Sequence, residues 1–396
     1  MHALILPSWF PTAHAPRNGA YFYQQLRALH DAGHRIGVVY PEYHSLRGLS
    51  TEALATHRFQ TRWYLEHEMP VLRRHGWNVL SRAPGSYTRL IRSAVRLAER
   101  YAAVYGRPDV IHALSAQWAG GAAARLATQW NRPMALTEHF SGFMRDALTS
   151  EQRYWARTAF DRAHAVAAVS PALRTAIQAY TTRRTRSIGL VPNPIDLSFF
   201  VPPSARPAPP PVVWASVGRL VSGKATATVL RAVAGVSACG LDVRLHVVGD
   251  GPERERLQTL ARTLGVSPQV RFHGRLPPEG VRNILQQAHG YVLASHHETF
   301  GIPVVEALAC GCAVLATRCG GPEYILSGER GRMVAPHSTA ALERALIGMT
   351  RSLLQNPSRG ATPADRTRLH NRFSYDTFVT RTINLYQNAK RHWASS

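Results

Sequence analysis

Short apolar runs alternate with longer helical patterns along the first half of the chain. Strand-forming runs occur at His2–Leu6, Arg35–Tyr40, Val110–Ala113, Ala135–Thr137 and Ala165–Val169. Between them, apolar residues recur every three or four positions at Tyr21–Ala32, Tyr87–Tyr105 and Gly120–Trp130. The short runs predict buried strands, and the longer patterns predict amphipathic helices. Strands that alternate with helices predict a parallel sheet with helices on both faces.

The same alternation starts again after a proline-dense segment. Val201–Pro211 interrupts the pattern and predicts a stiff linker. Beyond it, strands are predicted at Val212–Val217, Val243–Val248, Val270–His273, Gly290–Ala294 and Ala313–Thr317, and helices at Ala227–Val236, Pro252–Leu264, Val281–Gln287 and Pro303–Ala309. We therefore predict an α/β protein with two Rossmann-like domains that face each other across a cleft.

The domain boundaries follow from this pattern. The first domain is expected at residues 1–197, the linker at 198–211 and the second domain at 212–373. A last helical pattern, Tyr375–Lys390, comes after the second domain, and we expect residues 374–396 to pack back on the first. Ligands of open α/β sheets bind at the carboxyl ends of the strands, so the loops that follow strands are where chemistry is expected.

Composition agrees with a folded protein of two domains. The chain has 396 residues, of which 45% are hydrophobic and 18% charged, and it is too long for one typical core. No apolar run reaches the roughly 18 residues of a spanning helix. The first residues lack the basic and long apolar segments of a signal peptide. We expect a cytoplasmic protein that could also lie on the inner face of the cell membrane.

The formal net charge of +23 is extreme. Only Lys224 and Lys390 are lysines, and the arginines are spread over both halves of the chain. Such charge could attract nucleic acid, an anionic membrane or phosphorylated substrates, although a compositional bias toward arginine would explain much of it. No nucleic-acid-binding signature accompanies the charge, so nucleic acid is not the expected partner.

Two segments of the first domain could serve a membrane or an acceptor. The Tyr87–Tyr105 pattern is basic and amphipathic, as in helices that lie on membranes and also as in ordinary packing helices with a solvated face. Its arginines are Arg89, Arg92, Arg96 and Arg100. The stretch Phe59–Trp77 is predicted as an acceptor-side loop, because its aromatic planes suit sugars and acyl chains; simple burial of these rings is the alternative.

The most informative segment is Glu298–Glu306, which follows a predicted strand and opens a predicted helix. The turn before such a helix has free backbone N–H groups and a positive helix end, which suit an anionic ligand. Carboxylates beside a phosphate site need a ligand rich in hydroxyls. A nucleotide sugar offers both a diphosphate and sugar hydroxyls.

The positions of two cations support a diphosphate ligand, and the spacing of the cysteines argues against a metal site. Arg219 and Lys224 follow the Val212–Val217 strand, where two cations would neutralise a diphosphate and stabilise it as a leaving group. Three cysteines cluster late in the chain, but their spacing is not that of a metal site, and cysteine also acts as a small hydrophobe. These are Cys310, Cys312 and Cys319. With no Asp-x-Asp motif present, we expect no metal and no cofactor other than the nucleotide-sugar substrate.

These motifs in order resemble the GT-B retaining glycosyltransferases of family 4. They are Gly218-Arg219-Leu220, Lys224, Val248-Gly249-Asp250-Gly251-Pro252, and Glu298 with Glu306. The resemblance covers nearly the whole chain, closely in the second domain and loosely in the first. It implies that Arg219 and Lys224 contact the donor phosphates, that Glu298 holds the transferred hexose and that Glu306 holds the ribose.

The resemblance also implies roles for loop residues. Phe300, Gly301 and Ile302 would offer backbone N–H groups to sugar and phosphate, and Gly274 with Arg275 would touch the base. In the first domain, Gly19 matches a glycine-rich turn at the donor phosphate, and His139 would lie near the donor hexose, with Glu138 behind it. Two departures are Ala225, where the family usually has glycine, and a single glycine at position 19.

The implied reaction is transfer of a hexose from a UDP- or GDP-linked donor, with retention and without metal. The acceptor hydroxyl would attack from the leaving-group side and pass its proton to a donor phosphate oxygen. The expected acceptor is a glycan or a lipid-linked oligosaccharide of cell-surface polysaccharide synthesis. A nucleotide-sugar 2-epimerase of the same architecture, a basic nucleic-acid-binding protein and a non-catalytic nucleotide-sugar sensor remain as alternatives.

Overall fold

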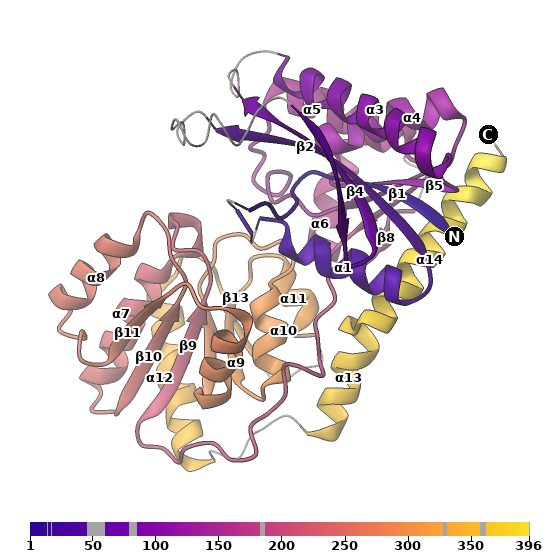
Figure 1. Cartoon of the computed structure of the whole chain (residues 1–396). Helices are drawn as coiled ribbons and strands as arrows, with labels where there is room; N and C mark the ends of the chain where they lie inside the picture. Colours follow the sequence, from indigo (N-terminus) through magenta and orange to yellow (C-terminus); the bar gives the residue numbers. More distant parts are fainter. Residues whose placement is uncertain are drawn as a thin grey trace. The chain divides into compact units, whose positions relative to one another are not determined.

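The computed structural model divides the chain into two compact units (Figure 1). It describes all residues except 14, 17, 46–59, 79–84, 183–186, 328–330, 357–361 and 396. The first unit contains Met1–Asn193 and Phe378–Ser396, and the second contains Pro194–Thr377. Two Rossmann-like units, each an open and mostly parallel sheet with helices, confirm the predicted fold class.

The sheet of the first unit has the order β3-β4-β2-β1-β5-β6-β7-β8. Its strands are β1 (His2–Pro7), β2 (Arg35–Ser45), β3 (Thr61–Glu66), β4 (Met69–Asn78), β5 (Val110–Leu114), β6 (Met134–Glu138), β7 (Ala165–Ala168) and β8 (Gly189–Leu190). All neighbours pair in parallel except β3, which runs antiparallel to β4. The strand order reverses between β1 and β5, and ligands of open α/β sheets bind at the carboxyl ends of the strands at such a point.

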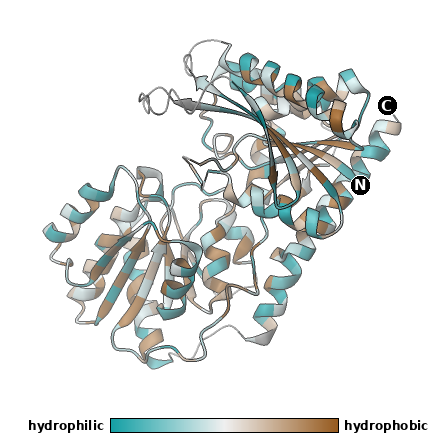
Figure 2. Ribbon diagram, viewed as in Figure 1, coloured by the Kyte–Doolittle hydropathy of each residue, from teal (hydrophilic) through white to brown (hydrophobic). Residues whose placement is uncertain are grey.

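Helices cover the sheet of the first unit on both faces (Figure 1). They are α1 (Ala20–Asp31), α3 (Ser86–Tyr105), α4 (Trp118–Trp130), α5 (Ser150–Arg162), α6 (Pro171–Gln178) and most of α14 (Tyr375–Ala394). The helix α4 packs against both α3 and α5, while α1 contacts β2 and α6 contacts β7 and β8. Hydrophobic colour concentrates along the strands in Figure 2, while the helices alternate hydrophobic and polar patches, as expected for surface helices around a buried sheet.

One predicted element of the first unit is wrong. The expected acceptor-side loop Phe59–Trp77 contains the hairpin β3–β4, apart from residue 59, which lies outside the described residues. Residues alternate across β3, with Trp63 and Leu65 exposed and Tyr64 and Glu66 less so. This period of two is typical of a strand. The sequence does not show it as an apolar–polar alternation, because charged residues occupy positions on the buried side.

The second unit has a six-stranded parallel sheet of order β11-β10-β9-β12-β13-β14. Its strands are β9 (Val212–Val217), β10 (Val243–Val248), β11 (Val270–Gly274), β12 (Gly290–Leu293), β13 (Ala313–Thr317) and β14 (Gly331–Val334). Its helices are α7 (Thr226–Ala238), α8 (Arg254–Thr263), α9 (Pro278–Gln287), α10 (Ile302–Ala309), α11 (Gly321–Ile325), α12 (Thr339–Gln355) and α13 (Pro363–Phe373). The order reverses between β9 and β12, which places their carboxyl ends at the point where open α/β sheets bind ligands.

Two segments near the boundaries of the units are each held by one unit. The proline-rich segment is tied to the second unit, because the Arg206 guanidinium donates to the carbonyls of Gln286, Cys310 and Gly311 at 2.8–3.2 Å. From Phe378 onward, α14 belongs to the first unit. There the Tyr386 hydroxyl lies 2.9 Å from Nδ1 of His112 on β5.

Candidate functional site

The loop after β9 is held against the loop after β10. Gly249 has φ +133, and a Cβ there would lie 1.8 Å from the carbonyl oxygen of Gly218, so only glycine allows this approach. The Leu220 N–H also donates to the Asp250 carbonyl at 3.0 Å. A short 3-10 turn, Ser222–Lys224, then leads into α7. These contacts fix the loop that carries both predicted cations.

Lys224 and Glu298 form an ion pair at the carboxyl ends of β9 and β12. The Ser295 hydroxyl donates to the same carboxylate oxygen, Oε1, at 2.8 Å. The loops also bind each other directly, since the His296 N–H donates to the Gly223 carbonyl at 2.9 Å. The Glu298 side chain is 12% exposed and that of Lys224 is 32% exposed. The carboxylate is therefore fixed through one oxygen, and no described residue is bonded to the other.

The segment after Glu298 presents backbone N–H groups. Glu298 itself is anchored by two backbone bonds, from its N–H to the Cys319 carbonyl (2.9 Å) and from the Gly321 N–H to its carbonyl (2.8 Å). Within the described residues, the N–H groups of residues 300–302 at the start of α10 have no acceptor. The first N–H groups of a helix lack partners within it, so these three can bind an anion.

Glu306 lies one turn into α10, in surroundings that disfavour charge. Burial raises the pKa of the Glu306 carboxyl to about 7. The phenol of Tyr291, on β12, is fully buried, and its pKa is raised well above its ordinary value by burial, with further contributions from the negative charges of Glu298 and Glu306. Its hydroxyl donates to the Val217 carbonyl at 3.3 Å. Tyr291 therefore links the end of β9 to the region of both glutamates.

The other residues of the second unit that were predicted to contact the donor also follow the carboxyl ends of strands. Arg219 is exposed, and no described residue pairs with its guanidinium. Gly274 ends β11 and accepts from the Gly249 N–H at 2.7 Å. Arg275 is 67% exposed and lies 3.8 Å from an Asp250 carboxylate oxygen, a separation at which an exposed pair contributes little stability. The structure thus joins Lys224 and Glu298 directly, and leaves Arg219 and Arg275 open to solvent.

Gly19 and His139 lie together in the first unit. Gly19 has φ +73 and precedes α1, and a Cβ there would lie 2.5 Å from the Trp9 carbonyl oxygen. The His139 ring packs edge-on against Phe22 of α1, with a centroid separation of 4.7 Å. Burial lowers the pKa of His139 to about 3; nearby His112 adds to this shift and the side chain of Asn193 opposes it. Within the described chain, neither of the two buried ring nitrogens makes a hydrogen bond of good geometry. His139 is therefore a neutral, buried imidazole beside the first turn of α1, with Asn193 as a polar neighbour.

Glu138 holds the turn that presents His139. Its buried carboxylate accepts four hydrogen bonds of 2.7–2.8 Å, from the Ser115 hydroxyl and from the backbone N–H groups of Ala116, His139 and Phe140. Burial raises the pKa of Glu138, and these four bonds oppose that rise by favouring the charged form. The ends of β5 and β6 are thereby locked together around one carboxylate.

Comparisons with known proteins agree with this geometry. A family model for the glycosyl transferases group 1 matches residues 203–361, and one for glycosyltransferase family 4 matches residues 19–199. Glycogen synthase of Mycobacterium tuberculosis is 28% identical over 311 residues, which are 76% of this chain and 74% of that protein. D-inositol 3-phosphate glycosyltransferase of Actinosynnema mirum is 34% identical over 221 residues, or 51% of this chain and 52% of that one.

The chain is a GT-B glycosyltransferase of group 1 and family 4. Solved structures share the fold of this glycosyltransferase. Sucrose-phosphate synthase from Thermosynechococcus elongatus matches with a TM-score of 0.76 at 20% identity, covering 100% of both chains. Anabaena Alr3699/HepE in complex with UDP and glucose matches with a TM-score of 0.70 at 19% identity, covering 97% of this chain and 99% of that one.

Family and fold were predicted from the sequence and are confirmed, whereas the roles of individual residues stay predictions. The sequence did not point to Ser295 or Tyr291, although Ser295 stands at a strand end three positions before Glu298. Such a small polar residue at a strand end is the signal that could have found it. Tyr291 gave no signal, because a buried aromatic in a strand is ordinary.

Among the described residues of this glycosyltransferase, no group of three or more His, Cys, Asp or Glu side chains is arranged to hold a metal ion, and metal independence stays a prediction. Cys310, Cys312 and Cys319 are buried with free thiols, as small hydrophobic residues would be. No described helix is long and apolar enough to span a bilayer.

Proposed function

We propose that this glycosyltransferase moves a hexose from a UDP- or GDP-linked donor to a glycan or lipid-linked acceptor, with retention and without a metal. The observation that carries the proposal is the Lys224–Glu298 pair beside the free N–H groups of residues 300–302. A cation and N–H groups suit the diphosphate, and the fixed carboxylate suits sugar hydroxyls.

The proposed chemistry is positioning and charge stabilisation. Arg219 and Lys224 neutralise the diphosphate as its bond to the sugar breaks, and Glu298 stabilises the positive charge on the sugar. The acceptor hydroxyl attacks from the same face and passes its proton to a donor phosphate oxygen. His139, whose pKa is about 3, stays uncharged near neutral pH and serves as a hydrogen-bonding group to the hexose. Glu306 holds the ribose hydroxyls.

The donor class also has support from relatives. The HepE neighbour is described in complex with UDP and glucose, and it shares this fold. Sucrose-phosphate synthase, glycogen synthase and D-inositol 3-phosphate glycosyltransferase are other glycosyltransferases similar to this chain. A UDP-hexose is therefore the first donor to test, followed by a GDP-hexose, with Gly274 and Arg275 as the proposed contacts to the base.

On the acceptor side, we propose that the first unit binds the anionic cytoplasmic face of the membrane. The exposed face of α3 carries an arginine stripe: Arg89, Arg92, Arg96 and Arg100. Two of the exposed large hydrophobic side chains lie at its C-terminal end: Val104 of α3, which is 63% exposed, and Trp63, which is 43% exposed and whose ring contacts Tyr105. Arginines with exposed apolar side chains fit anionic headgroups and the acyl boundary beneath them.

The deciding experiment is calorimetric titration with UDP- and GDP-hexoses in the absence of added metal. Lys224→Ala and Glu306→Ala should weaken binding of one donor, while Lys390→Ala, which replaces the other lysine of the chain, should leave it unchanged. Product analysis with that donor then separates transfer from 2-epimerisation. If the folded protein binds no nucleotide sugar, the proposal is wrong and the basic surface becomes the better clue to function.

A further inference from the structure

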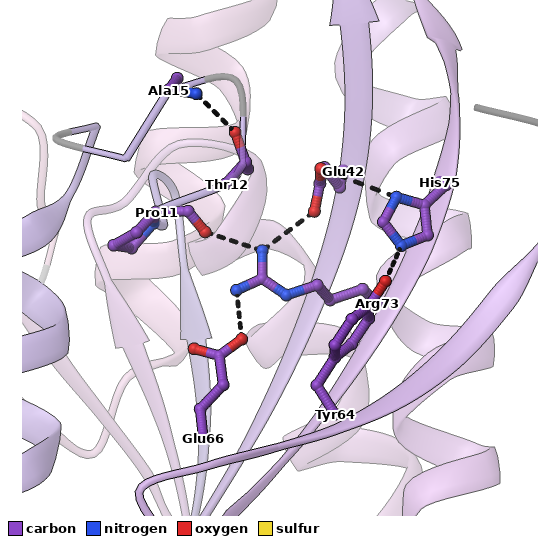
Figure 3. Close-up of polar contacts among 8 residues, drawn as sticks. All are labelled: Pro11, Thr12, Ala15, Glu42, Tyr64, Glu66, Arg73 and His75. Carbon is purple, nitrogen blue, oxygen red and sulfur yellow. Dashed lines mark hydrogen bonds and ion pairs between the residues drawn. The ribbon is translucent and has the colours of Figure 1, made fainter. Parts of the chain in front are cut away.

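A buried ion cluster lies on the inner side of the β2–β4 strands in the first unit (Figure 3). Arg73 on β4 is 5% exposed. Its guanidinium donates to Glu42 on β2 at 2.9 Å, to Glu66 on β3 at 2.6 Å and to the carbonyl of Pro11 at 2.8 Å. One side chain thus ties together two neighbouring strands and a loop distant in sequence.

The surroundings of Arg73 are closed by aromatic rings and by a second polar layer. The guanidinium carbon lies 5.1 Å from the Phe10 ring centroid and 5.5 Å from that of Tyr64. The Tyr64 hydroxyl lies 2.8 Å from Nε2 of His75, whose Nδ1 lies 3.6 Å from Glu42. The strand registers place these side chains on one face of the sheet, since Glu42 pairs with His75 and Arg73 with Tyr40. A buried guanidinium is stable only when its charge and N–H groups are matched in this way.

The contact to Pro11 connects the cluster to the turn at Gly19. Pro11 lies in the segment between β1 and α1, where Thr12 and Ala15 exchange backbone hydrogen bonds of 3.1 and 3.3 Å. The same segment contains the Trp9 carbonyl, against which Gly19 packs with no room for a Cβ. The segment is therefore held on one side by Arg73 and touches the start of α1 on the other.

The segment also contacts the His139 turn. The Trp9 ring stacks on Phe22 of α1, at a centroid separation of 6.2 Å, and packs against Phe140 at 5.6 Å. Phe22 in turn packs on His139. A shift of residues 8–12 would thus be felt both at the N-terminus of α1 and at the turn after β6.

We propose that Arg73 is a positioning residue of the transfer reaction, which fixes the segment that presents Gly19 and the α1 N-terminus. The inference rests on the proposed function, because it assigns that turn to the donor. Arginine suits the task because its planar fork can donate in several directions at once, whereas lysine is a single point charge. Arg73 needs no contact with substrate, and its effect passes through the Pro11 carbonyl.

The test compares Arg73→Ala, Arg73→Lys and Glu66→Gln with a control, Arg74→Ala, on the neighbouring position of β4. Donor turnover, binding of bare UDP or GDP, and hydrogen exchange of amides 18–23 are measured for each. We expect Arg73→Ala to lower turnover about tenfold to a hundredfold, as small misplacements of a site do, with a smaller loss in binding of the bare nucleotide and faster exchange at 18–23. Added guanidinium ion at a non-denaturing concentration should restore part of the turnover, and urea should not.

The second pair of variants keeps the test decisive if Arg73→Ala does not fold. Arg73→Lys should lose turnover because it cannot keep all three contacts, while Glu66→Gln, which keeps the contacts to Pro11 and Glu42, should retain it. The positioning role of Arg73 would be overturned if Arg73→Lys kept wild-type turnover and wild-type exchange rates. It would also be overturned if Arg73→Lys and Glu66→Gln lost turnover equally. If the wild type turns over no nucleotide sugar, the proposed function fails, and the exchange rates at 18–23 alone decide whether Arg73 fixes the turn.

Discussion

Burial sets the charge of two predicted site residues, Glu306 and His139. It raises the pKa of Glu306 to about 7 and lowers that of His139 to about 3. Both shifts favour the neutral form, as desolvation does. The two residues lie in different units, and the Glu306 carboxyl is expected to titrate near neutrality while the His139 imidazole is not, a difference that can be measured.

The first prediction concerns Glu306. Because its folded pKa exceeds the ordinary 4.5, the unfolded chain releases the proton first, and the stability given by the protonated form is lost as pH rises from about 4.5 to about 7. Glu306→Gln should remove up to about 3 kcal/mol of this pH dependence. Urea unfolding at pH 5 and pH 8 measures it, with the exposed Glu279→Gln as control. A wild-type slope that persists in Glu306→Gln would assign the titration elsewhere.

The second prediction concerns His139. With a pKa of about 3, the ring stays neutral across the working pH range. His139→Gln should lower donor turnover by about tenfold, the size of one hydrogen bond, without changing the shape of the pH–rate profile. Steady-state kinetics from pH 5 to pH 8 check this. Loss of a titration step in the variant would show instead that the imidazole acts as an acid or base.

At the scale of elements, the ends of α1 offer a matched pair of glycines. Gly19 and Gly33 both have positive φ, of +73 and +83, but only Gly19 is crowded. A Cβ added at Gly19 would lie 2.5 Å from the Trp9 carbonyl oxygen, whereas one added at Gly33 would meet nothing within 4 Å. The two positions thus separate backbone strain from close packing.

The third prediction uses this pair. Gly33→Ala should cost about 1 kcal/mol of stability, the strain of a left-handed alanine. Gly19→Ala should cost more, because its Cβ must displace the Trp9 carbonyl, and it should also reduce donor turnover. Thermal unfolding and donor kinetics of both variants provide the measurement. Equal costs in stability with full turnover in Gly19→Ala would mean that the segment yields easily.

The elements show how far sequence alone could go. Strands such as Gly290–Leu293 were predictable because they are buried on both faces and form continuous apolar runs. Lys224 and Glu298 could be placed together because the ends of parallel strands share one edge of a sheet. The β3–β4 hairpin was missed, because Glu66 and Arg73 look like solvated charges. Only the fold shows that Arg73 meets Glu42 and Pro11, which lie 31 and 62 residues away.

At the scale of the whole molecule, the C-terminal helix returns to the sheet of the first unit through a buried polar contact. His112 is neutral, with its pKa lowered to about 3 by burial, and both of its ring nitrogens have partners. Nδ1 lies 2.9 Å from the Tyr386 hydroxyl, and Nε2 lies 2.9 Å from the Thr137 hydroxyl.

The fourth prediction tests this tie. Tyr386→Phe leaves one buried nitrogen of His112 without a partner and should cost about 1–3 kcal/mol. Tyr154→Phe, at a position that is 62% exposed, should cost almost nothing. The free energy of unfolding from urea titration gives both values. If Tyr386→Phe leaves the free energy of unfolding unchanged, packing alone holds α14 to the sheet.

The net charge of +23 is the other property of the whole molecule that a partner must match. If the arginine stripe of α3 faces an anionic membrane, reversing Arg92, Arg96 and Arg100 to Glu should weaken binding to anionic vesicles by about a hundredfold or more, at about 1 kcal/mol per arginine. A charge-matched control reverses three exposed arginines of the second unit: Arg244, Arg256 and Arg262. Vesicle flotation at low and high salt compares them. If both triple variants lose binding equally, the membrane senses total charge and α3 has no special role; if only the α3 variant detaches, the charge is directed, and the acceptor is best sought among lipid-linked sugars.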